Sequence, residues 1–228
     1  LFKKYLRLIG YDINKLTFTL LVPLCSMNSN IIPGKTYFFA NHTDTIKLEL
    51  KLNKYLTYLL GWYLGDGTSS RGKKNPYRFS LCIGRDKLCY LIKIEKALQR
   101  SLGCSIIIEK RASDNILHFN SLSFDLLLRK LGLYGLKAPE KFIPDLIFNL
   151  KKNEQISFLK GLLQSDGSVY VGKKKNRGSK AVIDHATTSK KLAEGIVFLY
   201  RQLRFLPSIL TSLSKATYNK GVLIKANH

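Results

Sequence analysis

Acidic residues are scarce in this sequence of 228 residues. It has 15 Asp and Glu residues against 38 Lys and Arg residues, so its formal net charge at pH 7 is +23. Such a charge on a folded chain indicates a polyanionic partner, and nucleic acid is the commonest polyanion. The lack of negative charge therefore predicts a nucleic-acid-binding protein.

Long apolar runs and clustered metal ligands are also missing. The longest apolar stretches, Leu16–Leu24 and Tyr55–Leu64, are far shorter than the roughly 20 residues that span a bilayer, and no signal-peptide pattern opens the chain. The four cysteines form no CxxC pair and the four histidines stand apart. We therefore expect no membrane segment, no zinc site and no disulfide framework.

Hydrophobic residues make up 45% of the chain and aromatic residues 11%, which excludes a disordered or low-complexity protein. The length suits one large domain or two small ones. The chain is rich in Lys, Ile, Asn, Phe and Tyr, whose codons are rich in A and T. This composition hints at an AT-rich genetic compartment, such as an organelle (mitochondrion or chloroplast), a virus or a phage.

An internal repeat divides the chain. The segment Leu59–Thr68 recurs 100 residues later as Leu159–Ser168, and the triplet 72–74 recurs as 172–174. Each copy predicts a buried helix that ends at glycine, followed by a hairpin, a second helix and a second hairpin. We expect residues 1–50 to be an N-terminal extension of unclear role, 51–150 the first half and 151–228 the second half.

The repeat also predicts where the later elements lie. In the first half we expect a helix from Arg85, with Asp86 as its N-cap, and then strands and a closing helix at Cys104–Glu109, Asn115–Asn120 and Phe124–Leu131. In the second half we expect a helix capped by Ser189 and strands at Ser208–Leu213 and Lys220–Lys225. We expect the second half to be shortened, since no closing helix is predicted before His228.

The repeated helices carry small residues four positions apart, Gly61 and Gly65 in one copy and Gly161 and Ser165 in the other. Small side chains at this spacing let two helix backbones approach closely. If the helices pack along these residues, the aspartates that follow, Asp66 and Asp166, meet at the helix C-termini. Two neighbouring carboxylates repel unless cations lie between them, and hard oxygen ligands suit Mg²⁺.

The two repeated segments resemble the paired motifs of single-chain LAGLIDADG homing endonucleases. The segment 137–144 between them is similar to the corresponding stretch of the intein-type branch, and the resemblance covers about residues 52–228. It implies an α+β fold of two pseudo-twofold related αββαββ(α) halves, which form a saddle on double-stranded DNA. It also implies a monomer that makes a double-strand break with two or three divalent ions, Mg²⁺ above all.

The resemblance implies site residues as well. The metal-binding aspartates of the family correspond to Asp66 and Asp166, its metal-contacting carbonyls to Gly65 and Ser165, and its active-site lysine to Lys141. Leu64 and Gln164 stand where the family usually has an acid. DNA contacts are expected from basic residues on or beside the first hairpin of each half: Lys73, Lys74, Arg78 and Arg85, then Lys173, Lys174, Lys175, Arg177 and Lys180.

Two other functions keep the same fold and basic surface. One is an intron maturase that binds RNA, and the other is a non-catalytic DNA-binding protein on a decayed LAGLIDADG scaffold. The two aspartates favour metal chemistry over the second of these, whereas nothing in the sequence separates a nuclease from a maturase.

Overall fold

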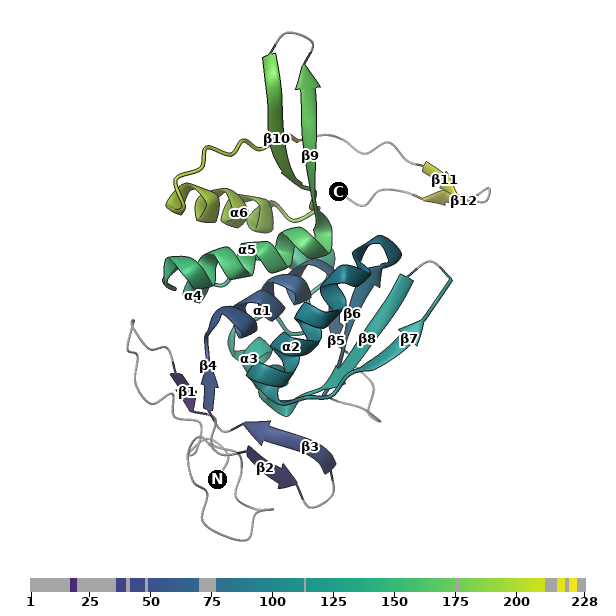
Figure 1. Cartoon of the computed structure of the whole chain (residues 1–228), viewed down its shortest axis with the longest axis vertical. Coiled ribbons are helices and arrows are strands. Elements are labelled where there is room, and N and C mark those ends of the chain that lie inside the picture. The colour runs from purple at the N-terminus through teal and green to yellow at the C-terminus, as the bar shows by residue number, and fades with distance from the viewer. Residues whose placement is uncertain are drawn as a thin grey trace.

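The structure is a computed structural model. It describes the backbone of residues 17–19, 36–39, 42–47, 49–69, 77–112, 114–174, 177–211, 217–219 and 222–224, and most side chains between 50 and 171 and between 181 and 211. The predicted helix–hairpin order is present in the first half (Figure 1). Its elements are α1 (Lys54–Asp66), β5 (Gly67–Ser69), β6 (Arg78–Gly84), η3 (Arg85–Tyr90), α2 (Leu91–Leu102), β7 (Ile107–Lys110), β8 (Asp114–Asn120) and α3 (Leu122–Lys130).

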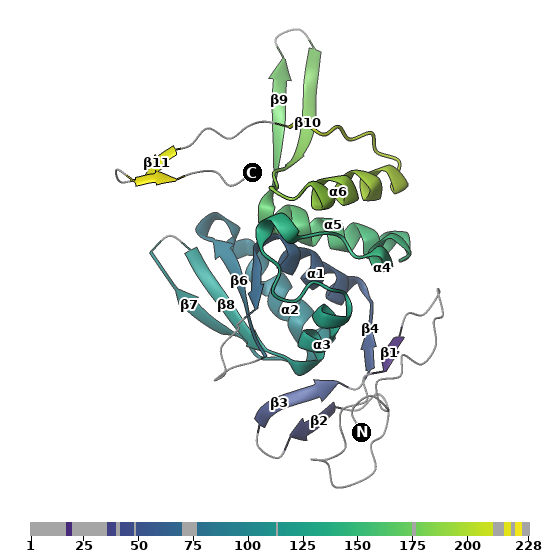
Figure 2. The ribbon, with the colours of Figure 1, turned by 180° about the vertical axis from the view of Figure 1, so that it is seen from behind.

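The first half builds one antiparallel sheet in the order β5-β6-β8-β7. Along β6 the buried residues Phe79, Leu81 and Ile83 alternate with more accessible ones, because successive side chains of a strand point to opposite faces. The buried face packs on the helices: the Phe124 ring of α3 lies 5.1 Å from that of Phe79 and 5.5 Å from that of Tyr63 in α1. Seen from behind, α3 lies beside α1 (Figure 2). One face of the sheet is thereby left for other contacts.

The second half begins with the same order of elements. Its elements, with the short segments that connect the halves, are η4 (Ala138–Glu140), α4 (Asp145–Phe148), α5 (Lys152–Asp166), β9 (Gly167–Lys174), β10 (Arg177–His185), α6 (Lys190–Gln202), β11 (Thr217–Asn219) and β12 (Val222–Ile224). Among the described strands, β9 pairs only with β10, and β11 only with β12. The mixed α+β fold with antiparallel sheets is therefore confirmed, and the two halves share their first four elements.

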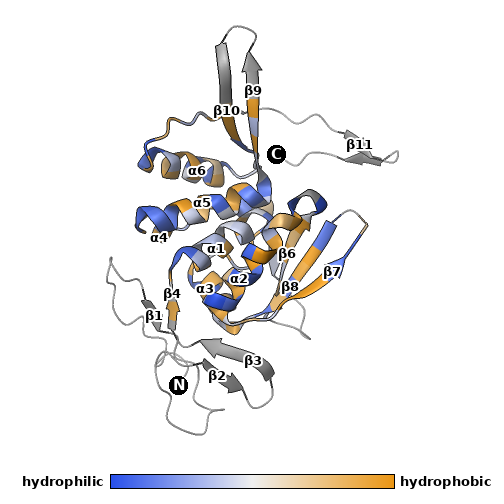
Figure 3. Cartoon of the chain, viewed as in Figure 1, coloured by the Kyte–Doolittle hydropathy of each residue, from blue (hydrophilic) through white to orange (hydrophobic). Residues whose placement is uncertain are grey.

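Short strands precede the first half. They are β1 (Thr17–Thr19), which pairs with β4 (Glu49–Lys51), and β2 (Thr36–Phe39), which pairs with β3 (His42–Lys47). In the part of the chain that the structure describes, no helix is both long and apolar enough for a bilayer span. Figure 3 shows α5 and α6 as mixtures of hydrophobic and hydrophilic residues, whereas β6 is largely hydrophobic.

Several predicted boundaries are wrong. The strand expected at 208–213 is absent over 208–211, and of the strand expected at 220–225 the structure describes β12, which pairs with β11. The helix expected from Arg85 begins as the 3-10 turn η3, whose N-cap is Gly84 and not Asp86. The Ser189 cap is confirmed, since its hydroxyl accepts a hydrogen bond from the backbone N–H of Leu192 at 3.2 Å.

The first motif helix ends at a glycine, as the sequence predicts. α1 continues through Asp66, and its C-cap Gly67 is extended, with φ −91°. A Cβ atom at Gly67 would lie 2.4 Å from the Tyr63 ring and 2.5 Å from the Cα atom and the carbonyl oxygen of Tyr63. Glycine is therefore required here by the close approach of Tyr63 and not by the backbone conformation.

The two motif helices pack backbone to backbone. A Cβ atom on Gly61 would lie 2.0 Å from the carbonyl oxygen of Phe158, and one on Gly161 would lie 2.1 Å from that of Tyr58. Real Cβ atoms do not approach other atoms this closely, so only glycine permits the separation seen between α1 and α5. The two distances are nearly equal, which is what a twofold relation between the helices requires.

The Gly161→Ala substitution is expected to lower the free energy of unfolding by about 3 kcal/mol, because the methyl group must push the helices apart. The matched control is Gly195→Ala in α6, where the new Cβ meets only the Ile143 side chain, at 3.2 Å or more. That variant gains helix propensity and should stay within about 1 kcal/mol of wild type. Chemical denaturation measures both, and equal effects of the two variants would contradict the close-packed interface.

Candidate active site

The helix pair brings the two motif aspartates together. Asp66 ends α1 and Asp166 ends α5, and the residues just before them are in contact: a Cβ atom on Gly65 would lie 1.9 Å from the Ser165 hydroxyl oxygen and 3.2 Å from Cβ of Asp166. Asp66 is half-buried, whereas Asp166 is exposed. Both carboxylates therefore lie at one end of the helix interface, open to solvent on the Asp166 side.

Burial raises the pKa of Asp66 to about 6, and the negative charge of Asp166 adds to this shift. Lys87 and Lys141 oppose the shift through their positive charges. The C-terminal ends of two helices also place partial negative charge at this point. The negative charges in the site repel one another, and a bound cation would relieve this repulsion.

Lys141 lies on the carbonyl of the first motif. Its ammonium nitrogen donates a hydrogen bond to the Gly65 carbonyl oxygen at 2.5 Å. The backbone holds it there, because the carbonyl of Lys141 accepts a hydrogen bond at 2.6 Å from Ser189, the cap of α6. Burial lowers the pKa of Lys141, and the charges of Asp166 and Asp66 partly restore it. The predicted active-site lysine thus lies near both aspartates.

A second lysine, which the sequence analysis did not identify, lies on the carbonyl of the second motif. Lys87 belongs to η3 of the first half, and its ammonium group donates to the carbonyl oxygen of Ser165. The two motif carbonyls therefore each accept from one lysine. The repeat contains one indication of this role. When the two halves are aligned in sequence, Lys87, after the first hairpin, corresponds to a lysine in the second half, Lys191.

Two further polar contacts surround the site. Tyr58 donates to the Gln164 side chain at 2.8 Å, so the residue that replaces the usual acid in the second motif links α1 to α5. His185 ends β10 opposite Gly167, and its Nε2 atom lies 3.0 Å from the Tyr200 hydroxyl. Burial lowers the pKa of His185, against the opposing charges of Asp166 and Asp184. His185 is therefore a neutral neighbour of the second carboxylate at neutral pH.

The donor set suits a hard cation. The two carboxylates and the carbonyls of Gly65 and Ser165 are all oxygen ligands, the kind that Mg²⁺ and Mn²⁺ prefer. Each carbonyl has a second lone pair that its lysine does not use. Within the described ranges, no three His, Cys, Asp or Glu side chains gather into a metal cluster, so the fit depends on the carbonyl oxygens as well as on Asp66 and Asp166.

The predicted DNA-binding residues that the structure describes lie in both halves. Arg78 begins β6 and is half-buried, and Arg85 is exposed and donates to the Arg111 carbonyl oxygen at 3.3 Å. Lys173 and Lys174 end β9, and Arg177 and Lys180 lie in β10, so all four are on the second-half hairpin. The remaining three predicted contacts lie outside the described residues: Lys73, Lys74 and Lys175.

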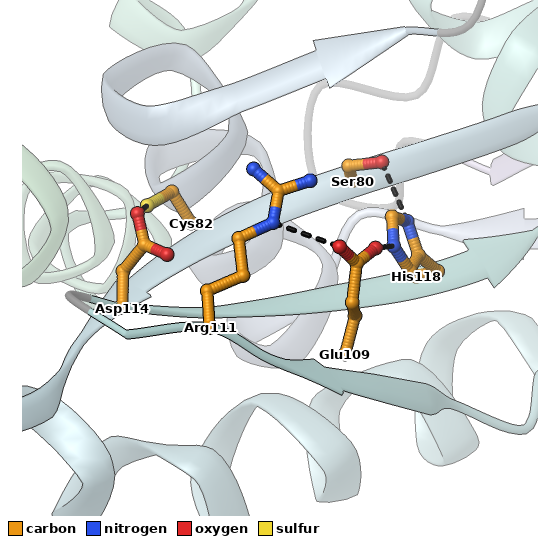
Figure 4. Close-up of polar contacts among 6 residues, drawn as sticks. All are labelled: Ser80, Cys82, Glu109, Arg111, Asp114 and His118. Atoms are coloured by element: carbon orange, nitrogen blue, oxygen red, sulfur yellow. Dashed lines mark hydrogen bonds and ion pairs between the residues drawn. The ribbon is translucent and has the colours of Figure 1, made fainter.

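A polar network on the first-half sheet was also missed by the sequence analysis. Figure 4 shows Ser80, His118, Glu109 and Arg111 joined in a row across β6, β8 and the end of β7. No local pattern reveals this row, because its members meet only through strand pairing. It lies on the sheet face opposite the core, since Ser80 alternates with the buried Phe79 and Leu81.

The comparisons with known proteins agree with this fold and these motifs. Residues 153–224 match the LAGLIDADG-like domain family. This segment begins in α5, includes the second motif and ends at β12. The second half is therefore similar to a LAGLIDADG-like domain, and the resemblance to the LAGLIDADG family that the paired motifs predict is confirmed.

Three longer curated proteins are similar in sequence. A Methanocaldococcus jannaschii protein named Uncharacterized protein MJ1054 is 26% identical over 189 residues, which cover 81% of this chain and 21% of that protein. The replicative DNA helicase DnaB of Synechocystis is 32% identical over 47% of this chain and 12% of its own length. A Thermococcus kodakarensis DNA polymerase is 25% identical over 76% of this chain and 9% of its own. This chain thus spans about a fifth or less of each relative.

Solved structures of homing endonucleases are similar in outline. I-DmoI in complex with DNA and Mn is 19% identical, with 70% of this chain and 82% of that chain covered and a TM-score of 0.43. I-WcaI bound to its DNA recognition sequence is 18% identical, with 75% and 74% covered and a TM-score of 0.41. TM-scores below 0.5 fix no residue-level correspondence with this chain.

The raised pKa of Asp66 predicts how stability depends on pH. The folded state binds a proton more tightly than the unfolded state, so this contribution to stability is complete below the ordinary pKa of 3.8 and is lost as pH rises through about 6. In EDTA, the Asp66→Asn variant should therefore melt at a higher temperature than wild type at pH 7.5 and lose this advantage at pH 4.

Differential scanning fluorimetry at the two pH values measures this difference. The matched control is Asp145→Asn, which removes an exposed carboxylate at the start of α4, far along the chain from either motif. Melting temperatures of Asp66→Asn and wild type that differ by the same amount at both pH values would contradict the assigned burial and repulsion.

Proposed function

We propose that this chain is a site-specific DNA endonuclease of the homing type, which cuts both strands of a long duplex target with a divalent cation. One observation carries the proposal: Asp66 and Asp166, one from each repeat, meet at the paired ends of α1 and α5 beside Lys87 and Lys141. A chain with a net charge of +23 suits a duplex-DNA partner. I-DmoI and I-WcaI, which are homing endonucleases bound to DNA, support the same class.

In this proposal the aspartates hold the cations, with the carbonyls of Gly65 and Ser165 as further ligands and Mg²⁺ as the expected ion. A divalent cation in such a site lowers the pKa of bound water and stabilises charge on a phosphodiester. The number of ions, two or three, follows from the family resemblance alone. An AT-rich genetic compartment, such as an organelle, is the proposed setting on codon grounds.

The lysines are proposed to stabilise the reacting phosphates. Each ammonium group is held near a motif carbonyl before DNA arrives, so no reorganisation is needed when negative charge grows on a phosphate oxygen. The half-buried position of Lys141 strengthens this effect, because charges attract more strongly where water is partly excluded. In this proposal the site needs both halves, because Lys87 of the first half donates a hydrogen bond to the carbonyl oxygen of Ser165 in the second motif.

Cleavage tests the proposal directly. A plasmid library with a randomised duplex segment is incubated with the protein and Mg²⁺, and newly cut double-stranded ends are captured and sequenced. Wild type should yield ends that share one long sequence. Asp66→Asn and Asp166→Asn should abolish cutting while the selected DNA still binds, because the phosphate contacts lie elsewhere.

The lysines are tested on the selected target. Lys87→Met and Lys141→Met should each lower the cleavage rate about 10²–10³-fold, the usual effect of removing one preorganised donor. The matched control is Lys96→Met on the exposed side of α2, which removes the same charge outside the site. Full double-strand cleavage by both aspartate variants would overturn the catalytic assignment.

Binding to nucleic acid should depend steeply on salt. Each phosphate contact releases counterions, so six to ten contacts predict a fall in affinity of about 10³–10⁵ between 50 and 200 mM salt. Fluorescence anisotropy with the selected duplex and with a structured RNA measures this. A flat salt response would contradict phosphate contacts, and tighter binding to the RNA would favour the maturase function.

A further inference from the structure

The sheet of the first half has one face that none of the described helices covers. Strand register defines its rows: Thr68, Ser80, His118 and Ile107 lie across β5, β6, β8 and β7, and Cys82, Ile116 and Glu109 form the next row. These side chains alternate with the buried ones, so they share the face opposite the core. Ile107 on this face is 64% exposed, which is high for an apolar side chain in a sheet.

This face begins beside the proposed active site. The charge of Asp66 is among the causes that raise the pKa of the Cys82 thiol, after burial and the nearby Asp114. Strand register places Cys82 near the first motif, because Gly67, which follows Asp66, pairs with Leu81, which precedes Cys82. The rows lead from there to the outer strand β7. A duplex that reaches Asp66 would lie along this face, and side chains of a two-stranded ribbon can enter the major groove.

A line of hydrogen bonds crosses from the first of these rows to the second and ends at Arg111, and we call it the hydrogen-bonded row (Figure 4). The Ser80 hydroxyl lies 2.8 Å from Nδ1 of His118, and Nε2 of His118 lies 2.9 Å from one oxygen of Glu109. The other oxygen of Glu109 accepts from Nε of Arg111 at 2.8 Å. Because an ionised carboxylate only accepts hydrogen bonds, Nε2 of His118 carries a proton, and Nδ1 accepts from Ser80 when the ring is neutral.

An acid on a surface that faces DNA needs an explanation. The chain has only 15 acidic residues, and a carboxylate facing a polyanion is repelled by it. Both oxygens of Glu109 are used within the row, and the hydrogen bonds from His118 and Arg111 hold the pKa of Glu109 below its usual range. Glu109 therefore serves to fix its neighbours and not to contact phosphate.

The arginine at the end of the row is fixed on one side and accessible on the other. Its side chain is 50% exposed and is held through Nε, and no described residue accepts a hydrogen bond from its two terminal nitrogens. A guanidinium held in this way presents a planar pair of N–H groups, which matches O6 and N7 of guanine in the major groove. Fixing the side chain before binding lowers the entropy lost on contact.

We propose that Arg111 is a specificity-determining residue that reads one guanine in the half of the target bound by residues 51–150. Glu109 and His118 are positioning residues, which orient the guanidinium through the hydrogen-bonded row. The inference rests on the proposed function, because it needs a duplex in contact with this sheet face. The second-half sheet has Asp184 at the register position of Ser80, so the guanine preference is expected in one half-site only.

The test is selection of binding sites from a randomised duplex DNA library in EDTA, which removes the cations that cleavage requires. Wild type is compared with Arg111→Lys, which keeps the charge and removes the fork, and with Glu109→Gln, which keeps the size and removes the charge. Lys96→Ala on α2 is the matched control outside the sheet face. Thermal melting of each variant verifies that it folds.

The expected result is a guanine preference at one position of the wild-type site. In Arg111→Lys this preference should fall about ten- to a hundredfold, with a matching loss of affinity for the guanine-containing site, while the preference at every other position changes little. In Glu109→Gln the same single position should lose preference, though by less, and a merely structural role would weaken all positions alike. Lys96→Ala should leave the preference unchanged.

Two results would overturn the inference, and they are distinguishable. If wild type selects no common sequence, site-specific recognition itself fails, and the proposed function falls together with this inference. If wild type selects a sequence and Arg111→Lys retains the same preference at every position, Arg111 contacts a phosphate or nothing. The proposed function then stands and this inference is wrong.

Discussion

The contact between the backbones of α1 and α5 is the constraint on which the rest of this structure depends. Gly61 and Gly161 each place a backbone hydrogen where any side chain would collide with the carbonyl of the facing helix. Because the helices meet this closely, their C-terminal ends converge and deliver one aspartate from each half to the same point. Neither half could form this site alone, so the interface that stabilises the fold also assembles the site.

The charges at this point are costly in the absence of a partner. Two carboxylates share a partly buried space with two helix C-termini, and the raised pKa of Asp66 expresses the repulsion. The lysines offset part of this repulsion, and each occupies a carbonyl instead of pairing directly with a carboxylate. The aspartates thus remain free to take a cation, which would be impossible if each formed its own salt bridge. The repulsion lowers the stability of the folded state, and binding of a cation to the aspartates would raise it again.

How far the sequence predicts the structure depends on the range of the interaction. The paired aspartates and the small residues before them are visible because their spacing is local and repeated. The role of Lys87 could not be predicted locally, because its position beside Ser165 depends on where β6 ends and how η3 turns the chain. The row through Glu109 and His118 depends on strand register. The strand predicted at 208–213 followed from the repeat, but the described residues there form no strand, and the apolar Ile209 and Leu210 are exposed.

The two halves differ in what surrounds a common core. The first half has a four-stranded sheet with an accessible polar face, whereas the described strands of the second half form two separate hairpins, one of which carries the predicted basic residues. Contacts to phosphates position a protein on DNA without regard to sequence, whereas contacts to base edges discriminate between bases. If a duplex binds across both halves, we therefore expect the second half to supply mainly phosphate contacts and the first half to supply mainly base contacts. The repeat places one aspartate from each half at the centre of the molecule. Because the flanking sheets differ, the two half-sites of a DNA target can differ in sequence, and the protein can then bind in one orientation.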